Sequence, residues 1–178
     1  MGYTLRKMKE TDLDKVEKML ELAKRNMREV LKIDQWQAGY PNRQSFEKDI
    51  SDGTAYVFCD ENDVAVAAAA VIIGNEPLYD KIEAGEFSGV WQCDEKSYAA
   101  VHRVCVDLEL TCRGVGSSFM LTIADFCKDH GCTAIRIDTH RYNKPMRRML
   151  SKCGFCETGI IYIPEPNSNE RITYEKIL

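Results

Sequence analysis

The segment from Ala100 to Met120 constrains the fold of this chain more strongly than any other, because its hydrophobic period changes partway along. Residues 99–107 are apolar on both faces, which is typical of a strand buried in the middle of a sheet. From Gly114 onward the apolar side chains recur at helical spacing, which predicts an amphipathic helix ending near Gly131. The chain therefore passes from a buried strand, through a short loop, directly into a helix.

The loop between that strand and that helix has the composition of an anion-binding site. Its residues are Thr111, Cys112, Arg113, Gly114, Val115, Gly116 and Ser117. Glycines let backbone N–H groups approach an anion closely, and the first turn of the helix adds donors and a favourable dipole. The loop lacks the lysine of a Walker loop. It also comes too late for a dinucleotide fold and has only two of the three glycines. It predicts a phosphate cradle of another kind.

Hydrophobic periodicity elsewhere predicts strands and helices with no linker or repeat between them. The predicted strands cover residues 3–8, 55–59, 64–73, 134–138, 155–163 and 171–177. The predicted helices cover residues 13–31 with a break near Asn26, residues 43–50, and a segment capped by Asn143 and ended by Gly154. This order predicts one mixed α/β domain over residues 1–178.

A second motif begins at the predicted cap, where Asn143-Lys144-Pro145-Met146-Arg147-Arg148-Met149-Leu150 is followed by Gly154-Phe155. With the glycine loop, it resembles the pattern of the GNAT superfamily of N-acetyltransferases. That pattern is Gln/Arg-x-x-Gly-x-Gly/Ala after a central strand, Asn at a later helix start, then Gly-Phe. The resemblance covers most of the chain. It implies a single GNAT-like domain with a central, twisted, mostly antiparallel sheet of about seven strands and helices on both faces.

The resemblance also implies that acetyl-CoA binds as a co-substrate, without a metal. The backbone of the central strand would contact the pantetheine arm and the thioester through Val104, Cys105 and Val106. The Val106 N–H would polarise the thioester carbonyl. Residues 111–117 would surround the pyrophosphate with main-chain donors.

Asn143 would reach the pantetheine, and Met146 would line the apolar side of the cofactor, although a core position suits Met146 equally. Two residues depart from the family pattern. Thr111 replaces the usual Gln or Arg, which removes a long donor, and Arg113 can partly substitute for it. Leu150 stands where many members carry a tyrosine that protonates the leaving thiolate, so the general acid is unassigned.

His102 is the candidate general base that would deprotonate the amine. It lies two residues before Val104, so both side chains are expected on one face of the strand, with Cys105 on the other. Some members of the family place a basic His or Glu on this strand. A histidine packed against the sheet fits the sequence equally well. His130 is expected to cap a helix, and His140 to lie in a loop.

Aromatic residues of two irregular segments, 33–41 and 75–97, are the candidates for binding the acceptor: Trp36, Tyr40 and Trp91. In the resembled fold these segments flank the acceptor site. Loop aromatics also commonly cover the edge of a core, and this alternative stays open.

Charge and apolar runs exclude several classes of partner. The net charge is -4 and Lys and Arg form no long basic stripe, so nucleic acid is not expected. Neither a membrane-length apolar run nor an N-terminal signal is found, which predicts a cytoplasmic protein without membrane contact. The eight cysteines are expected as free thiols, with Cys153 and Cys156 both facing the core. An exposed final strand could form a homodimer.

The sequence thus predicts transfer of an acetyl group from acetyl-CoA to a primary amine, by direct attack in a ternary complex. The acceptor, a small molecule or a protein amine, is not identified, and neither is the acyl chain preference. A domain that binds acyl-CoA as a sensor or scaffold without turnover is the alternative. A phosphate-binding α/β domain outside this family is a third interpretation.

Overall fold

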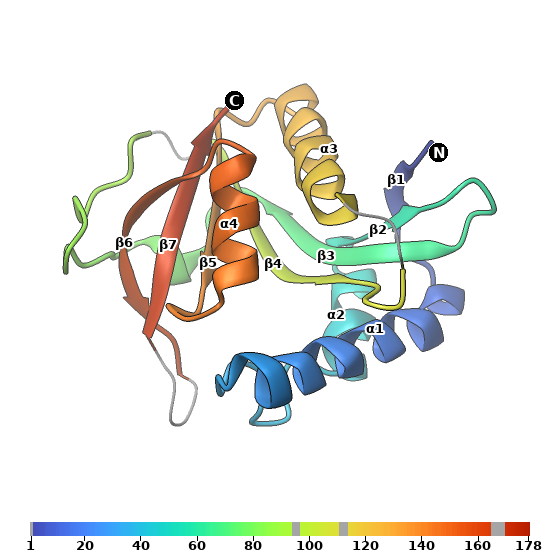
Figure 1. Cartoon of the computed structure of the whole chain (residues 1–178). Helices are drawn as coiled ribbons and strands as arrows, with labels where there is room; N and C mark the ends of the chain where they lie inside the picture. Colours follow the sequence, from blue (N-terminus) through green and yellow to red (C-terminus); the bar gives the residue numbers. More distant parts are fainter. Residues whose placement is uncertain (1, 94–96, 111–113, 165–169) are drawn as a thin grey trace. The chain divides into compact units, whose positions relative to one another are not determined.

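The computed structural model describes residues 2–93, 97–110, 114–164 and 170–178 (Figure 1). Seven strands form a mixed sheet in the order β1-β2-β3-β4-β5-β7-β6. They are β1 (Thr4–Lys7), β2 (Ala55–Cys59), β3 (Ala65–Ile73), β4 (Tyr98–Val106), β5 (Ala134–Thr139), β6 (Cys156–Tyr162) and β7 (Glu170–Ile177). The helices are α1 (Leu13–Asn26), α2 (Arg43–Ser51), α3 (Val115–Asp129) and α4 (Lys144–Lys152). No described helix is long and apolar enough to cross a membrane.

The predicted fold class is confirmed. β4 and β5 pair in parallel, whereas β1 with β2, β2 with β3, β5 with β7 and β6 with β7 pair antiparallel. The chain divides into two compact units, one made of Met1–Val71 and His102–Phe119, the other of Ile72–Val101 and Met120–Leu178. That residues 1–178 act as one domain stays a prediction.

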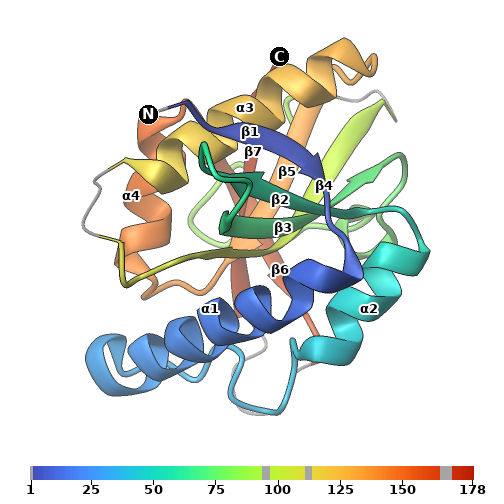
Figure 2. The same cartoon turned by 90° about the vertical axis from the view of Figure 1, so that its right-hand side faces the viewer.

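In the first unit, helices pack on both faces of β2 (Figure 2). Alternate residues of β2, such as Val57, join the apolar residues of α1 and α2 in one core cluster. Phe58 points the other way and stacks on Phe119 of α3, with 5.3 Å between the ring centroids. Since strand side chains alternate between faces, a strand with five buried residues needs such cover on each face.

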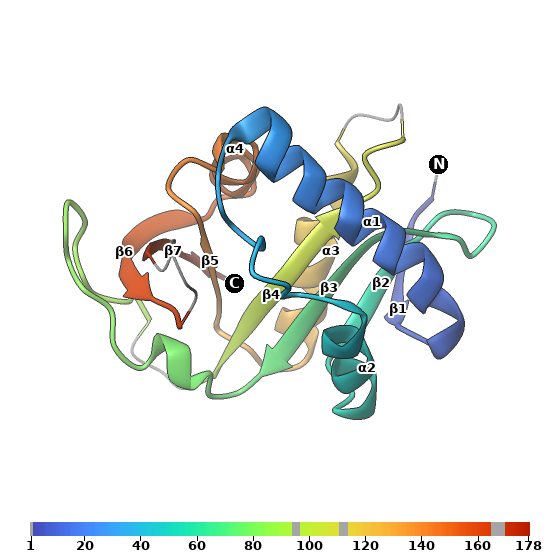
Figure 3. The ribbon, with the colours of Figure 1, turned by 90° about the horizontal axis from the view of Figure 1, so that it is seen from below.

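The predicted break near Asn26 is also confirmed. α1 ends at Asn26, and residues 27–31 continue as a single widened π turn that Lys32, in the left-handed conformation, terminates. Figure 3 shows α1 running beside the second half of β4, and Cys105 of β4 belongs to the same core cluster as Leu20 of α1.

In the second unit, α4 lies over β5 and β7 (Figure 1) and ends at Lys152. The predicted glycine, Gly154, follows the cap residue Cys153 with a φ of 82°. The amides of Gly154 and Phe155 donate to the carbonyls of Ser151 and Leu150, which closes the helix as a Schellman motif. The expectation that the final strand is exposed at an edge was wrong. β7 lies between β5 and β6, because both neighbours supply it with antiparallel partners.

The described cysteines are free thiols, and five of the seven are buried. Cys153 faces the core as predicted. Cys156 does not, since it begins the edge strand β6 and is exposed. Residues on the solvent side of an edge strand need no apolar partner, which the CxxC spacing alone cannot reveal.

Candidate active site

The second half of β4 is the centre of the candidate site, and its backbone is irregular there. Residues 98–101 are buried, whereas His102, Arg103 and Val104 are only partly buried. Arg103 has a φ of 57°, in the left-handed region that a side chain other than glycine rarely adopts. Such a residue interrupts the alternation of a strand, as in a β-bulge. The two-residue period therefore cannot be used to place His102 and Val104 on one face.

An acid on α2 holds this irregular residue. Nη1 of Arg103 donates to both carboxylate oxygens of Asp49, each at 2.9 Å. Nε of Arg103 donates to the hydroxyl of Tyr40 at 2.8 Å, and the guanidinium lies 5.3 Å from the centroid of that ring. Tyr40 is thus joined to the residue that follows His102. Tyr40 was a candidate from the sequence, whereas Asp49 and Arg103 were not.

Asp49 is only 5% exposed, which has an electrostatic consequence for the strand beside it. Burial raises the pKa of Asp49 above its ordinary value, and the Arg103 guanidinium opposes that rise. A buried acid and a fixed guanidinium therefore lie beside His102 in the sequence of β4, because Arg103 is the residue that follows it.

The end of β4 is fixed to its neighbours by Asp107, which is 5% exposed. Its amide donates to the carbonyl of Val66 in β3 at 2.9 Å, and its carboxylate forms an ion pair with Lys15 of α1. The same carboxylate accepts the amide of Glu109 at 3.0 Å, which starts the turn toward α3. The strand is therefore anchored immediately before the predicted phosphate loop.

Thr111, Cys112 and Arg113 of that loop lie outside the described residues. Gly114 has a φ of 92°, and a Cβ there would meet no atom within 4 Å. Its carbonyl accepts the amide of Ser118 at 2.9 Å, so α3 begins directly after it. The amides of Val115, Gly116 and Ser117 come before Ser118, whose amide makes the first of these helical hydrogen bonds. Amides at this end of a helix are suited to binding an anion.

Cys105 is not suited to an acyl-enzyme mechanism. It is 2% exposed and packs in the core cluster of the first unit. Burial raises the pKa of its thiol to about 12, so the thiol stays protonated at neutral pH.

In the second unit, Asn143 begins α4 as predicted. Its side-chain oxygen accepts the amide of Met146 at 3.3 Å, and the residue is 7% exposed. The capping bond explains a helix start at this residue without a cofactor. Met146 is partly buried. Leu150 is fully buried, so the position where the family often carries a tyrosine belongs here to the core.

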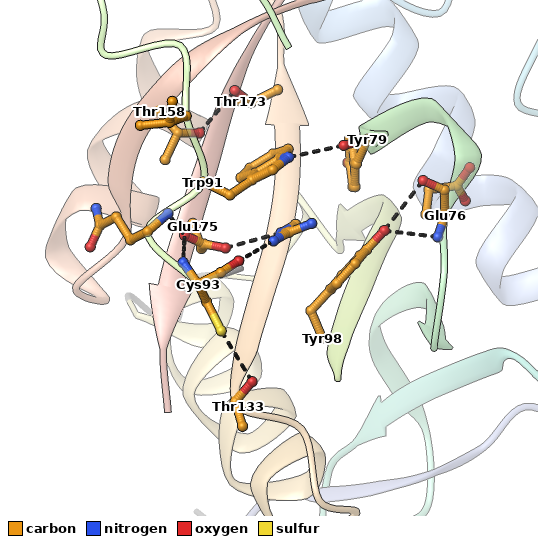
Figure 4. A network of polar contacts seen from close by, with 12 residues as sticks. Glu76, Tyr79, Trp91, Cys93, Tyr98, Thr133, Thr158, Thr173 and Glu175 are labelled. Atoms are coloured by element: carbon orange, nitrogen blue, oxygen red, sulfur yellow. Dashed lines mark hydrogen bonds and ion pairs between the residues drawn. The ribbon is translucent and has the colours of Figure 1, made fainter. Parts of the chain in front are cut away.

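Trp91 lies in a network of polar and aromatic contacts in the second unit (Figure 4). Its indole N–H donates to the carbonyl of Tyr79 at 2.9 Å, and its ring covers the Arg136 guanidinium at 4.3 Å. Arg136 donates to Glu175 at 3.0 Å, and both residues are buried. This network holds the segment before β4 against β5 and β7. Trp36, in the first unit, is partly buried against the core cluster.

Comparisons with known proteins agree on one family. A family model described as the acetyltransferase (GNAT) family matches residues 16–155. A GNAT-family acetyltransferase from Streptococcus agalactiae 2603 is similar in structure, with a TM-score of 0.85 and 29% identity over 100% of this chain and 96% of that chain. Another, from Listeria monocytogenes 4b F2365, has a TM-score of 0.70 and 18% identity over 99% and 95% of the two chains.

The fold is also similar to that in the NatC complex bound to Gag peptide and CoA. The TM-score is 0.66 and the identity 9%, over 100% of this chain and 99% of that chain. A search of curated proteins found no match.

Proposed function

Because the chain belongs to the acetyltransferase (GNAT) family, we propose that it transfers an acetyl group from acetyl-CoA to a primary amine by direct attack in a ternary complex. One observation carries this proposal: β4 is anchored at its end, and α3 begins directly after Gly114, whose φ is positive. In this proposal the backbone of Val104 to Val106 contacts the pantetheine and the thioester, and residues 111–117 bind the pyrophosphate. Asn143 and Met146 are proposed contacts from the second unit.

His102 is the proposed general base. A neutral imidazole nitrogen can accept a proton from an ammonium group, directly or through water. Asp49 supports this role because it fixes Arg103, the residue that follows His102, through two bonds of 2.9 Å. Tyr40, Trp36 and Trp91 are proposed to contact the acceptor, and Tyr40 has the best support because it bonds to Arg103.

The thioester supplies an activated acetyl group, and its leaving group needs little assistance. A thiol has a pKa of about 8.5, so the thiolate can depart without a proton from the protein. The buried Leu150 is compatible with such a reaction. Protonation of the thiolate by solvent then completes the cycle, with one thiol released for each amine acetylated.

Leu150 also favours a second function, because a leucine cannot donate a proton to the thiolate. In this function the chain binds acyl-CoA without turnover. The two functions separate in one experiment: the chain is incubated with acetyl-CoA and a panel of primary amines, and thiol release and acetylated products are both quantified. Direct transfer predicts equal amounts of thiol and acetylated amine, and no burst of thiol without amine. A burst without amine would contradict direct attack. CoA binding without any release across the panel would favour the sensor.

A further inference from the structure

A groove of about 480 Å³ lies along α1, in the same unit as His102. Six of its seven lining residues lie on or just beyond α1, and the seventh follows the end of β4: Lys18, Glu21, Leu22, Lys24, Arg25, Arg28 and Glu109. Positions 18, 21, 22, 25 and 28 follow the three- and four-residue spacing of one helical stripe. The groove therefore runs lengthwise along α1. Figure 3 shows the helix itself beside β4.

The groove has the opposite charge to the chain as a whole. Four of its side chains are cationic and two are anionic, whereas the chain carries a net charge of -4. Among the described residues, Lys18 and Arg25 take part in no ion pair, and Arg28 pairs with its exposed neighbour Glu29 at 3.1 Å. An acidic protein that collects cations in one groove attracts anionic ligands to it.

Lys24 is the cation of the groove that is most withdrawn from solvent. Its side chain is partly buried, and this burial lowers the pKa of the ammonium group. A carboxylate bound beside it would stabilise the charged form and replace the lost hydration. The opposing charges are Glu21, on the same helix, and Glu109, which forms the wall on the β4 side.

The segment after α1 bonds both to residues of the groove and to the strand that carries the candidate base. Gln37 donates from its amide to the carbonyl of Lys24 at 3.1 Å and accepts from Nη1 of Arg28 at 3.5 Å. Three residues later, Tyr40 bonds to Arg103, the neighbour of His102. Residues 37–40 thus link Lys24 and Arg28 of the groove to the residue that follows His102.

We propose that this groove binds the acidic segment of a peptide acceptor, whose primary amine is acetylated beside His102. The inference rests on the proposed function and narrows its acceptor class. A peptide fits better than a small anion because Lys18 and Arg28 are ten residues apart, about 15 Å along a helix. An extended chain covers that length with about five residues.

A binding measurement tests the proposal without requiring turnover. A short fluorescent peptide with a free N-terminal amine and several Glu residues is compared with its Gln counterpart, in the presence of saturating CoA. Anisotropy titrations are made at low and at high salt on wild type, on Lys18→Gln/Arg25→Gln, and on Lys128→Gln/Lys152→Gln. The last variant removes the same charge from exposed positions on α3 and α4.

We expect wild type and the α3/α4 variant to bind the Glu peptide about fivefold more tightly than the Gln peptide at low salt, from the sum of two exposed ion pairs. The preference should fall to within about twofold in Lys18→Gln/Arg25→Gln, and salt should weaken it in wild type. Equal affinities in wild type, or a preference that survives in the groove variant, would overturn the proposal. CoA affinity and thiol release with simple alkylamines, measured on the same proteins, report separately on the proposed function.

Discussion

Nη1 of Arg103 lies 2.9 Å from both carboxylate oxygens of Asp49, so a buried acid on α2 fixes the residue that follows His102 in β4. Burial raises the pKa of Asp49. When folding raises the pKa of a group, the group contributes stability at pH values below its unfolded pKa, which for an aspartate is near 3.8. This contribution is lost as the pH rises through the pKa of the folded state. Asp49→Asn should remove this dependence.

Urea unfolding of wild type and Asp49→Asn between mildly acidic and neutral pH measures that difference. The free energy of unfolding of wild type should fall relative to the variant as the pH rises. The variant should gain stability relative to wild type toward neutral pH, because its amide, like the protonated carboxyl, carries no charge that has to be buried. If the free energies of unfolding of wild type and variant change in parallel with pH, the Asp49 carboxyl has the same pKa in the folded and unfolded states, which would contradict this prediction.

The left-handed backbone of Arg103 predicts an unusual order of stabilities for two substitutions. Arg103→Gly and Arg103→Ala lose the same bonds to Asp49 and Tyr40, but only glycine adopts a φ of 57° without strain. The glycine variant should therefore be more stable by about 1 kcal/mol, the reverse of the usual order in a strand. Chemical unfolding at one pH decides this, and an alanine variant at least as stable would argue against the strained conformation.

Gly114 and Gly131 offer a matched pair for the phosphate loop. Both have positive φ, 92° and 81°, and a Cβ at either would meet no atom within 4 Å. Each Gly→Ala change should cost about 1 kcal/mol of stability through backbone strain alone. Only Gly114→Ala should also weaken CoA binding, by about fivefold in a calorimetric titration. Equal CoA affinity in both variants would separate Gly114 from the cofactor site.

Leu150→Tyr restores the residue that the family often carries, yet we expect it to harm this protein. Leu150 is fully buried, and a larger side chain with a hydroxyl must displace its neighbours. The loss should be about 1–3 kcal/mol, with no gain in thiol release. Thermal unfolding and turnover are measured on the same sample. Faster thiol release by Leu150→Tyr at unchanged stability would contradict this prediction, because it would mean that a tyrosine hydroxyl at position 150 reaches the thiolate.

The elements of this fold were predictable where the hydrophobic period was strong. The change of period after residue 107 correctly predicted β4 and α3, and the cap at Asn143 correctly predicted α4. The place of β7 between β5 and β6 was not predictable, because strand order depends on packing between distant segments. No local signal distinguishes an inner strand with one polar face from an edge strand.

The candidate site was predictable only as a list of residues along β4. The Asp49–Arg103 pair joins positions 54 residues apart, which no spacing rule connects. A signal did exist, since Asp49 follows the buried Phe46 by three residues and therefore lies on the inner face of α2. A carboxylate on an apolar helix face and an arginine in an apolar strand each require a partner, and pairing them would have found the contact.

We propose above that this chain transfers an acetyl group to an amine with His102 as the base. Thiol release from acetyl-CoA across the amine panel, compared between wild type, His102→Ala and His130→Ala, tests it most directly. We expect amine-dependent release that falls at least about 100-fold in His102→Ala, while CoA affinity stays within about twofold. His130→Ala, at the exposed end of α3, should behave as wild type. Release that is equal in all three proteins would contradict the role of His102, and CoA binding without release would contradict the transfer itself.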